Sequence, residues 1–259
     1  MKALQRILFA VVLLFLYAPL LIMVFFSFNA GRSTSVFTGF SLKWYAELFN
    51  DSATITALKN TLILAVSSAL IATVLGTLAA VGIFHMRSKF MKSATMTVTN
   101  IPMMNPDIVT GVSMMLLFIF AAKLLGLSSS LSFVTLLIAH VTFNLPYVIL
   151  NVLPKLRQTD RHLSEAAEDL GCTPVQSFFK VVLPSISSGV VTGMMMAFTL
   201  SLDDFVISYF TSGPDFQTLP LRIFSMTKKT VKPDMYAMSS IIFFTVLVLL
   251  VIINLAQSK

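Results

Sequence analysis

The sequence of 259 residues contains few charged residues, since Asp, Glu, Lys and Arg together make up only 11% of it. A soluble domain carries about a quarter charged residues, so this scarcity argues against a soluble globular protein. Only one cysteine, Cys172, is present, which excludes an intrachain disulfide and a zinc site built from cysteines. The three histidines, His85, His140 and His162, lack metal-ligand spacing, and we predict that each lies in a loop or at the end of a span.

The sequence also lacks the pattern G-x-x-x-x-G-K-[ST], which binds the phosphates of ATP. If ATP drives this protein, another subunit must hydrolyse it. The Ser, His and Asp residues show no grouping of nucleophile, base and orienting acid, so we expect no catalytic residues, no metal and no cofactor bound by this chain. The formal net charge of +7 is better explained by Lys and Arg at the cytoplasmic ends of membrane spans than by binding of nucleic acid.

Long hydrophobic runs occupy most of the chain, which is 56% hydrophobic. The short alternating segments of a membrane β-barrel do not occur. The sequence therefore predicts an all-α polytopic membrane protein, a single transmembrane domain over 1–259 whose cytoplasmic loop covers 154–184. The six predicted transmembrane helices are residues 7–28, 57–84, 108–125, 131–153, 186–210 and 236–256.

The charges between these spans predict their orientation. The short loop 87–92 carries Arg87, Lys89 and Lys92, and short loops follow the positive-inside rule best. Both termini are therefore expected in the cytoplasm. The first apolar run is longer than the hydrophobic region of a signal peptide, which favours a retained span. In the outer segment 29–57, Trp44 and Tyr45 indicate a surface helix with aromatic side chains at the lipid interface.

The polar stretch 165–184 reads E-A-A-E-D-L-G-C-T-P-V-Q-S-F-F-K-V-V-L-P and predicts two short helices joined by a tight turn. Asp160 is suited to cap the first helix, and Gly171 to end it in the left-handed conformation. The residues expected on one face of this helix are Leu163, Ala166, Ala167 and Leu170.

The second helix of the loop has its own start signal. Thr173 is the expected N-cap, Pro174 the first helical residue and Gln176 the partner of Thr173 in a capping box. Pro184 then marks the entry to the fifth span. A rigid pair of helices of this kind can transmit force from a moving partner.

Three carboxylates lie at or near membrane depth. Asp203 and Asp204 fall in the outer half of the fifth span, and Asp107 follows Pro106 at the start of the third. An acid at mid-helix costs roughly 2.5–3.5 kcal/mol on insertion scales. We expect no basic residue deep within the spans to pair with these acids, since Lys123 stands at an outer end. Unpaired acids beside a pathway predict a cationic solute. The aromatic residues expected to add cation–π contacts are Phe205, Tyr209, Phe143 and Tyr147.

Asp203 and Asp204 are adjacent, and adjacent residues of a helix point about 100° apart. We therefore expect one of them to face the pathway and the other to face a partner subunit or a helix N-terminus. The alternative is that both are capping or subunit-contact residues.

The stretch 165–184 also matches the EAA signature of ABC-importer permeases: Glu-Ala-Ala, three residues, Gly, nine residues, an aliphatic residue, one residue, Leu-Pro. Val181 stands where Ile is usual. In that family this segment is the cytoplasmic coupling helix that docks into a separate ATPase. The resemblance assigns ATPase coupling to Glu165, Ala166, Ala167, Asp169, Leu170 and Gly171.

Other stretches resemble the permeases of the spermidine/putrescine importer family, namely 103–109, 140–147, 163–171, 198–205 and 212–226. The resemblance implies a type I ABC importer permease fold in the bacterial inner membrane. It also implies four kinds of partner: a second homologous permease, a dimeric ATPase that uses ATP and Mg, a periplasmic polyamine-binding protein and membrane lipid.

Three alternatives remain open at this point. One is an ABC importer permease for another solute. A second is a stand-alone secondary transporter or channel, which would need no EAA loop. A third is a membrane enzyme, which would need a grouped set of catalytic residues.

Overall fold

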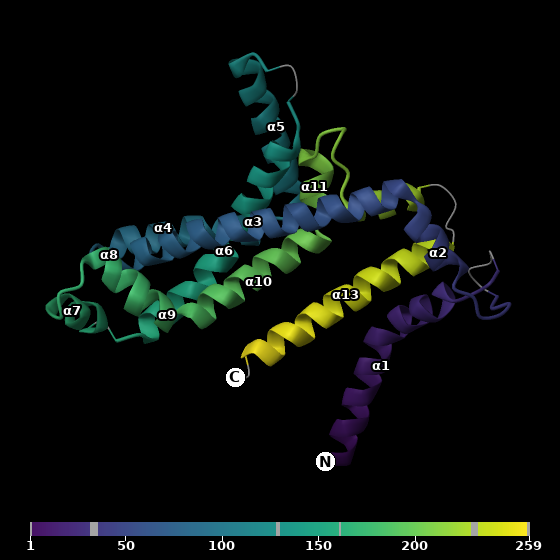
Figure 1. Ribbon diagram of the computed structural model, residues 1–259, viewed down its shortest axis with the longest axis horizontal. Coiled ribbons are helices and arrows are strands. Elements are labelled where there is room, and N and C mark those ends of the chain that lie inside the picture. The colour runs from purple at the N-terminus through teal and green to yellow at the C-terminus, as the bar shows by residue number, and fades with distance from the viewer. Residues whose placement is uncertain (1, 32–35, 128–129, 161, 229–232, 258–259) are drawn as a thin grey trace. The chain divides into compact units, whose positions relative to one another are not determined.

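A computed structural model of the chain describes residues 2–31, 36–127, 130–160, 162–228 and 233–257 (Figure 1). These residues are mainly helical, and no strand occurs among them. They form two compact units, one comprising Met1–Leu58 with Leu221–Lys259 and the other Lys59–Pro220. The second unit contains every residue expected to contact solute or ATPase.

The first unit is formed by the two ends of the chain. Its helices are α1 (Lys2–Ser27), α2 (Lys43–Asn50), the start of α3 (Ser52–His85), most of α12 (Leu219–Thr227) and α13 (Pro233–Gln257). Helix α13 packs against both α1 and α2. Asp51, just before α3, forms an ion pair with Arg222 of α12, at 3.1 Å.

The predicted surface helix in the outer segment is present as α2, but Trp44 is not an interfacial anchor. Its side chain is only 5% exposed, and its indole Nε1–H donates to the carbonyl oxygen of Asn29 at 2.7 Å. The Asn29 side chain in turn accepts from the backbone N–H of Thr38 at 2.8 Å. Trp44 therefore packs inside the fold, where its buried N–H has the Asn29 carbonyl as its acceptor.

The second unit contains most of α3 and a series of further helices. These are α4 (Lys89–Met104), α5 (Asp107–Leu125), α6 (Phe133–Gln158), α7 (His162–Asp169), α8 (Pro174–Ser177), a π-helix (Phe178–Val182), α9 (Leu183–Ser185), α10 (Ser187–Asp203) and α11 (Val206–Thr211). Within this unit, α7 and α8 lie at one end of α6 and α10, whereas α11 lies at the other (Figure 1).

The lengths and apolar character of the helices agree with the predicted spans. Helices α1, α3, α5 and α6 are each long and apolar enough to cross a membrane. The segment Pro174–Ser185 and helix α10 pass the same test together, with a bend of 73° between them. Helix α13 has 25 residues, and Asp234–Val248 is its described apolar part. The all-α polytopic architecture is thus confirmed.

Glycines let α3, α6 and α10 approach closely around Val148, which is fully buried. A Cβ atom at Gly193 would lie 3.1 Å from the Val148 Cα, and one at Gly76 would lie 2.7 Å from the Val148 Cβ. At Gly189 a Cβ would lie 2.8 Å from the carbonyl oxygen of Asn151. Gly189 and Gly193 form a G-x-x-x-G pattern, which favours close helix packing in membranes.

The predicted fifth span, 186–210, is not one continuous helix. Helix α10 ends at Asp203, and α11 begins only at Val206. Between them Asp204 is extended, with φ −62° and ψ 126°. Apolar residues flank this break on both sides, which is why hydropathy averaged over a long window predicted an unbroken span.

Candidate solute-pathway site and coupling loop

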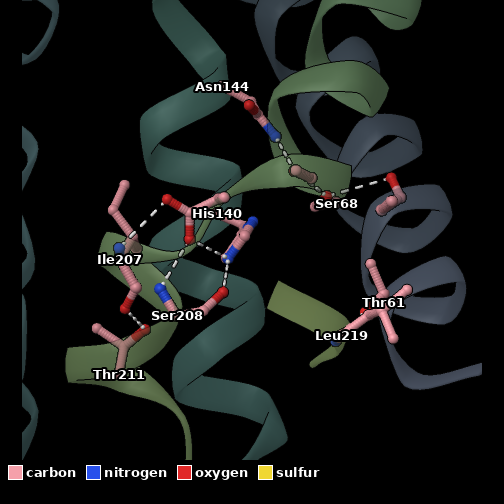
Figure 2. Close-up of polar contacts among 11 residues, drawn as sticks. Thr61, Ser68, His140, Asn144, Ile207, Ser208, Thr211 and Leu219 are labelled. Atoms are coloured by element: carbon pink, nitrogen blue, oxygen red, sulfur yellow. Dashed lines mark hydrogen bonds and ion pairs between the residues drawn. The ribbon is translucent and has the colours of Figure 1, made fainter. Parts of the chain in front are cut away.

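Asp204 caps the start of α11. Its Oδ1 accepts from the backbone N–H of Ile207 at 3.2 Å, and its Oδ2 accepts from that of Ser208 at 2.8 Å. Figure 2 shows both donors beside the break in the chain. The first N–H groups of a helix have no partner within the helix, so this carboxylate satisfies two groups that the break leaves unpaired. The expectation that one of the two aspartates meets a helix N-terminus is met by Asp204.

His140 lies beside this cap and corrects two predictions. It is fully buried in the second turn of α6, not in a loop or at a span end. Its Nε2 lies 3.1 Å from the Ser208 hydroxyl and 3.5 Å from Asp204 Oδ2 (Figure 2). A basic side chain within the spans is therefore available to one of the acids. The sequence concealed this contact because α11 folds back against α6 only after the break.

Asp203, the last residue of α10, has different surroundings. Its side chain is exposed, whereas only 8% of the Asp204 side chain is. Among the described residues, no side chain forms an ion pair with Asp203. Of the two adjacent carboxylates, only Asp203 is open to a solute.

The remaining predicted pathway residues divide into exposed and buried ones. Asp107 begins α5 and is exposed, and Tyr147 of α6 is partly exposed. Tyr209 is 49% exposed, and its ring centroid lies 5.6 Å from that of Phe205. Phe143 is only 7% exposed and packs with Ile207 in a small core. Phe143 is therefore buried in this structure, and its predicted contact with a solute stays a prediction.

A second buried polar group joins three helices of this unit. The Asn144 side-chain N–H donates to the Ser201 hydroxyl at 2.7 Å, and Ser201 lies 2.8 Å from the Ser68 hydroxyl (Figure 2). Thr61 of α3 accepts from the backbone N–H of Leu219 at 2.7 Å. Sequence reasoning missed these residues, although polar residues spaced along apolar spans are a signal for them.

The first helix of the cytoplasmic loop forms as predicted. Asp160 Oδ1 accepts from the His162 N–H at 3.0 Å, as an N-cap does. Gly171 has φ +88°, and the Cys172 N–H donates to the Ala167 carbonyl at 3.0 Å, so the helix ends in a left-handed turn. The predicted common face is divided, since Ala167 is buried whereas Leu170 is 87% exposed. The other residues assigned to ATPase coupling, which are exposed, are Glu165, Ala166, Asp169 and Gly171.

The predicted capping box of the second helix is also present. Thr173 accepts from the Gln176 N–H at 3.3 Å, and Gln176 accepts from the Thr173 N–H at 3.1 Å. The hydroxyls of Ser164 and Ser177 lie 2.9 Å apart and tie α7 to α8. The π-helix that follows was not predicted, because its local sequence is ordinary for an α-helix.

Glu165 also contacts a histidine of its own helix. Its carboxylate lies 2.9 Å from His162 Nδ1. This hydrogen bond, together with the negative charges of Glu165 and Asp160, raises the pKa of His162 above its ordinary value. Both side chains are largely exposed, so the contact leaves them accessible to a partner protein.

An open cleft of about 1080 Å³ lies beside the loop. Arg87, from the turn between α3 and α4, and Lys89 and Lys92, from the start of α4, contribute basic groups to its lining. Asp160, Glu165 and Glu168 contribute acidic ones. The cleft therefore presents charges of both signs next to the predicted coupling helix.

These features, an all-helical bundle of apolar spans with a capped EAA loop, are those of an ABC-importer permease. The sequence profile of the family described as "Binding-protein-dependent transport system inner membrane component" matches residues 72–258, and the chain belongs to this family. It is therefore a multi-pass inner-membrane protein and a non-catalytic transport permease.

Within this family, the chain is similar to permeases named for polyamine transport. The chain is 40% identical to the putrescine transport system permease protein PotI of Escherichia coli K12, over 88% of this chain and 81% of the relative. It is also 40% identical to the spermidine/putrescine transport system permease protein PotC of Haemophilus influenzae, over 96% and 94%. The corresponding PotC of Escherichia coli K12 is 38% identical, over 92% and 87%.

Solved structures share the fold. A permease chain of a bacterial ABC transporter that imports the acidic polysaccharide alginate has a TM-score of 0.74 at 17% identity, with 99% of this chain and 97% of that chain covered. An amino acid ABC transporter crystallised with histidines has a TM-score of 0.58 at 17% identity, with 83% and 97% covered. The predicted ABC importer permease fold is thus confirmed.

Proposed function

We propose that this chain is one of two homologous permeases of an ATP-driven polyamine importer, and that spermidine or putrescine passes beside Asp203 and Asp107. The observation that supports this proposal most directly is Asp203, which lies at the break of a span, is exposed, and forms no ion pair among the described residues. Similarity to relatives named for putrescine and spermidine transport supports a polyamine as the cargo. Carboxylates replace part of the hydration that an ammonium group loses in the pathway.

Aromatic side chains complete this proposed site. Phe205 and Tyr209 follow Asp203 by two and six positions, with their ring centroids 5.6 Å apart, and Tyr147 is partly exposed. A cation over such rings gains about 0.5–2 kcal/mol per contact. The gain per contact is small, which suits a transport pathway because a tightly held cargo does not leave.

The exposed side of α7 is the proposed docking point for a separate ATPase dimer that uses ATP and Mg. Leu170 is the most exposed large hydrophobic residue of this loop and provides an apolar contact surface. Glu165 and Asp169, which are exposed on the same helix, provide negative charges. The chain then runs without a loop from Thr173 through the π-helix into α10, which ends at Asp203. A displacement of α7 is thereby passed to the cargo site. Both termini lie in the cytoplasm, and a periplasmic polyamine-binding protein delivers the cargo.

Uptake by the reconstituted complex tests the cargo. Radiolabelled spermidine should accumulate in proteoliposomes in an ATP-dependent manner, and unlabelled putrescine should compete. An amino acid mixture and sulfate should not compete. Competition by either of these, with no effect of putrescine, would point to an importer for another solute.

A further inference from the structure

We infer that His140 is a positioning residue, which through Asp204 and Ser208 fixes the start of α11 and so leaves Asp203 alone to meet the cargo. The assignment of Asp203 to the cargo rests on the proposed function. The holding of α11 by His140 does not, because it follows from buried contacts alone.

The first step concerns the backbone at the break. Within a membrane protein, backbone N–H groups must find partners inside the protein, because lipid offers none. Asp204 supplies acceptors for the N–H groups of Ile207 and Ser208. Helix α11 has only six residues, so these two bonds satisfy the N–H groups of a third of its residues.

The second step concerns the proton of His140. Its Nε2 faces the Ser208 hydroxyl and Asp204 Oδ2, whereas its Nδ1 is buried and has no hydrogen-bond partner among the described residues. A proton on Nδ1 would therefore be a buried donor without an acceptor. The tautomer that fits has its proton on Nε2, where it is directed at the hydroxyl and the carboxylate.

The third step is the effect on the two aspartates. Three donors, from Ile207, Ser208 and His140, surround the Asp204 carboxylate, which is only 8% exposed. A cargo ammonium could reach it only by displacing a bond that holds α11. Asp203 lies one residue earlier, at the end of α10, is exposed, and accepts no hydrogen bond from a backbone N–H group of α11 among the bonds of the described residues.

The consequence reaches the aromatic residues. Helix α11 packs tightly against α5, since a Cβ on Gly111 would lie 2.9 Å from the Phe210 ring. A helix fixed at its start by His140 and along its side by α5 presents Tyr209 in one orientation. His140 thus determines the geometry of a site that it does not itself line.

Hydrogen exchange on the assembled complex tests this inference without reference to the cargo. We expect His140→Leu to speed amide exchange in residues 207–211 by about tenfold, as for one lost hydrogen bond to a charged group. His140→Gln, which retains a side-chain N–H donor, should exchange close to the wild-type rate. Equal exchange in wild type and His140→Leu, or failure of Gln to rescue, overturns the inference.

Ser208→Ala keeps the test decisive if His140→Leu does not assemble. It removes the hydroxyl that contacts Nε2 but keeps the backbone N–H that Asp204 accepts. Its exchange in residues 207–211 should also be faster than wild type, and an unchanged rate contradicts the role of this cluster. If wild type transports no polyamine, the proposed function fails, but these exchange rates still decide the role of His140.

Discussion

The adjacent residues Asp203 and Asp204 differ in their contacts more than in their chemistry. Asp204 accepts two backbone N–H groups and lies 3.5 Å from His140, whereas Asp203 is exposed. Replacement of each by asparagine should therefore change different properties: the KM for the cargo at Asp203, and the stability of α11 at Asp204.

Asp203→Asn should raise the KM for spermidine about tenfold, because it removes one of the two exposed carboxylates proposed to meet the cargo ammonium groups. The maximal uptake rate and the yield of assembled complex should change little. Initial rates of uptake over a range of spermidine concentrations measure this. An unchanged KM would remove Asp203 from the pathway.

Asp204→Asn is the matched comparison. One amide oxygen cannot serve both N–H groups of α11, so the expected cost is that of a weakened helix cap, about 0.5–2 kcal/mol. It should appear as a lower unfolding temperature of the complex and a lower maximal rate. A KM effect equal to that of Asp203→Asn would show that the two residues do not divide these roles.

His162 provides a pH dependence outside the membrane. Its hydrogen bond with Glu165 raises its pKa above the ordinary value of 6.5, so the charged pair persists to a higher pH than for a free histidine. The pair therefore helps to hold α7 fully below about pH 6.5, and this help is lost as the pH rises through the raised pKa. NMR titration of the histidine rings in Glu165→Gln should show a lower pKa for His162.

Glu168→Gln is the control for this titration. Glu168 contacts Ser164 and not His162, so its replacement should leave the His162 pKa nearly in place. Equal shifts in both variants would indicate a general loss of negative charge and not the specific bond to Glu165.

At this scale the sequence identified the carboxylates but not their roles. An acid in an apolar span is visible in the sequence, because burial of its charge is costly. Its partner is not, since His140 and Ser208 are separated by 68 positions and meet only through the packing of α11 on α6.

Among the elements, the cytoplasmic loop was the most predictable because its signals are local. Gly171, with φ +88°, and the Thr173–Gln176 capping box need no information from elsewhere in the chain. The 73° bend near Ile186 and the break after Asp203 were not predictable in this way. Pro184 marked the entry to the fifth span but did not give the angle of the bend, and the apolar residues on both sides of Asp203 and Asp204 concealed the end of α10.

Gly171→Pro should uncouple the permease from its ATPase. Proline fixes φ near −65° and removes the N–H that Gly171 donates to the Glu168 carbonyl at 2.9 Å. We expect loss of most ATP-dependent uptake and weaker co-purification of the ATPase. Gly171→Asn, which tolerates a positive φ, should retain both. Normal uptake by Gly171→Pro would refute the docking role of this turn.

Gly193→Val tests the packing of α10 on α6. Its Cβ would lie 3.1 Å from the Val148 backbone, and overpacking of this kind costs about 1–3 kcal/mol. The unfolding temperature of the purified complex should fall. Gly82→Ala is the control, because nothing lies within 4 Å of a Cβ there, and it should be neutral or slightly stabilising. A neutral Gly193→Val would contradict the close approach of the two helices.

For the whole molecule, the apolar composition alone predicted the all-helical membrane architecture. Few side chains of α1 are covered by this chain, since none is buried in its most apolar stretch of 18 residues and, among its described residues, only Ser27 at its end is buried. Its faces are available to lipid or to another subunit. The division of the described residues into two compact units was not predicted, because hydropathy records spans and not their contacts.

We predict that a partner subunit, and not this chain, hydrolyses ATP. The purified chain alone should show no ATP hydrolysis, because the sequence has no phosphate-binding loop. Hydrolysis should appear when the ATPase subunits are present, and a binding protein loaded with polyamine should increase it. Hydrolysis that stays with this chain after removal of every partner would overturn the assignment as a non-catalytic subunit.

The position of Cys172 allows a probe to be attached to the protein at a single site. It is the only thiol in the sequence, is partly exposed, and follows Gly171 at the tip of the predicted docking loop. A fluorophore or spin label reacted with the unaltered chain therefore attaches at a single point, beside α7. Distances from that label to a second label on the ATPase can follow the movement of the loop during ATP hydrolysis. No other cysteine of this chain has to be removed first.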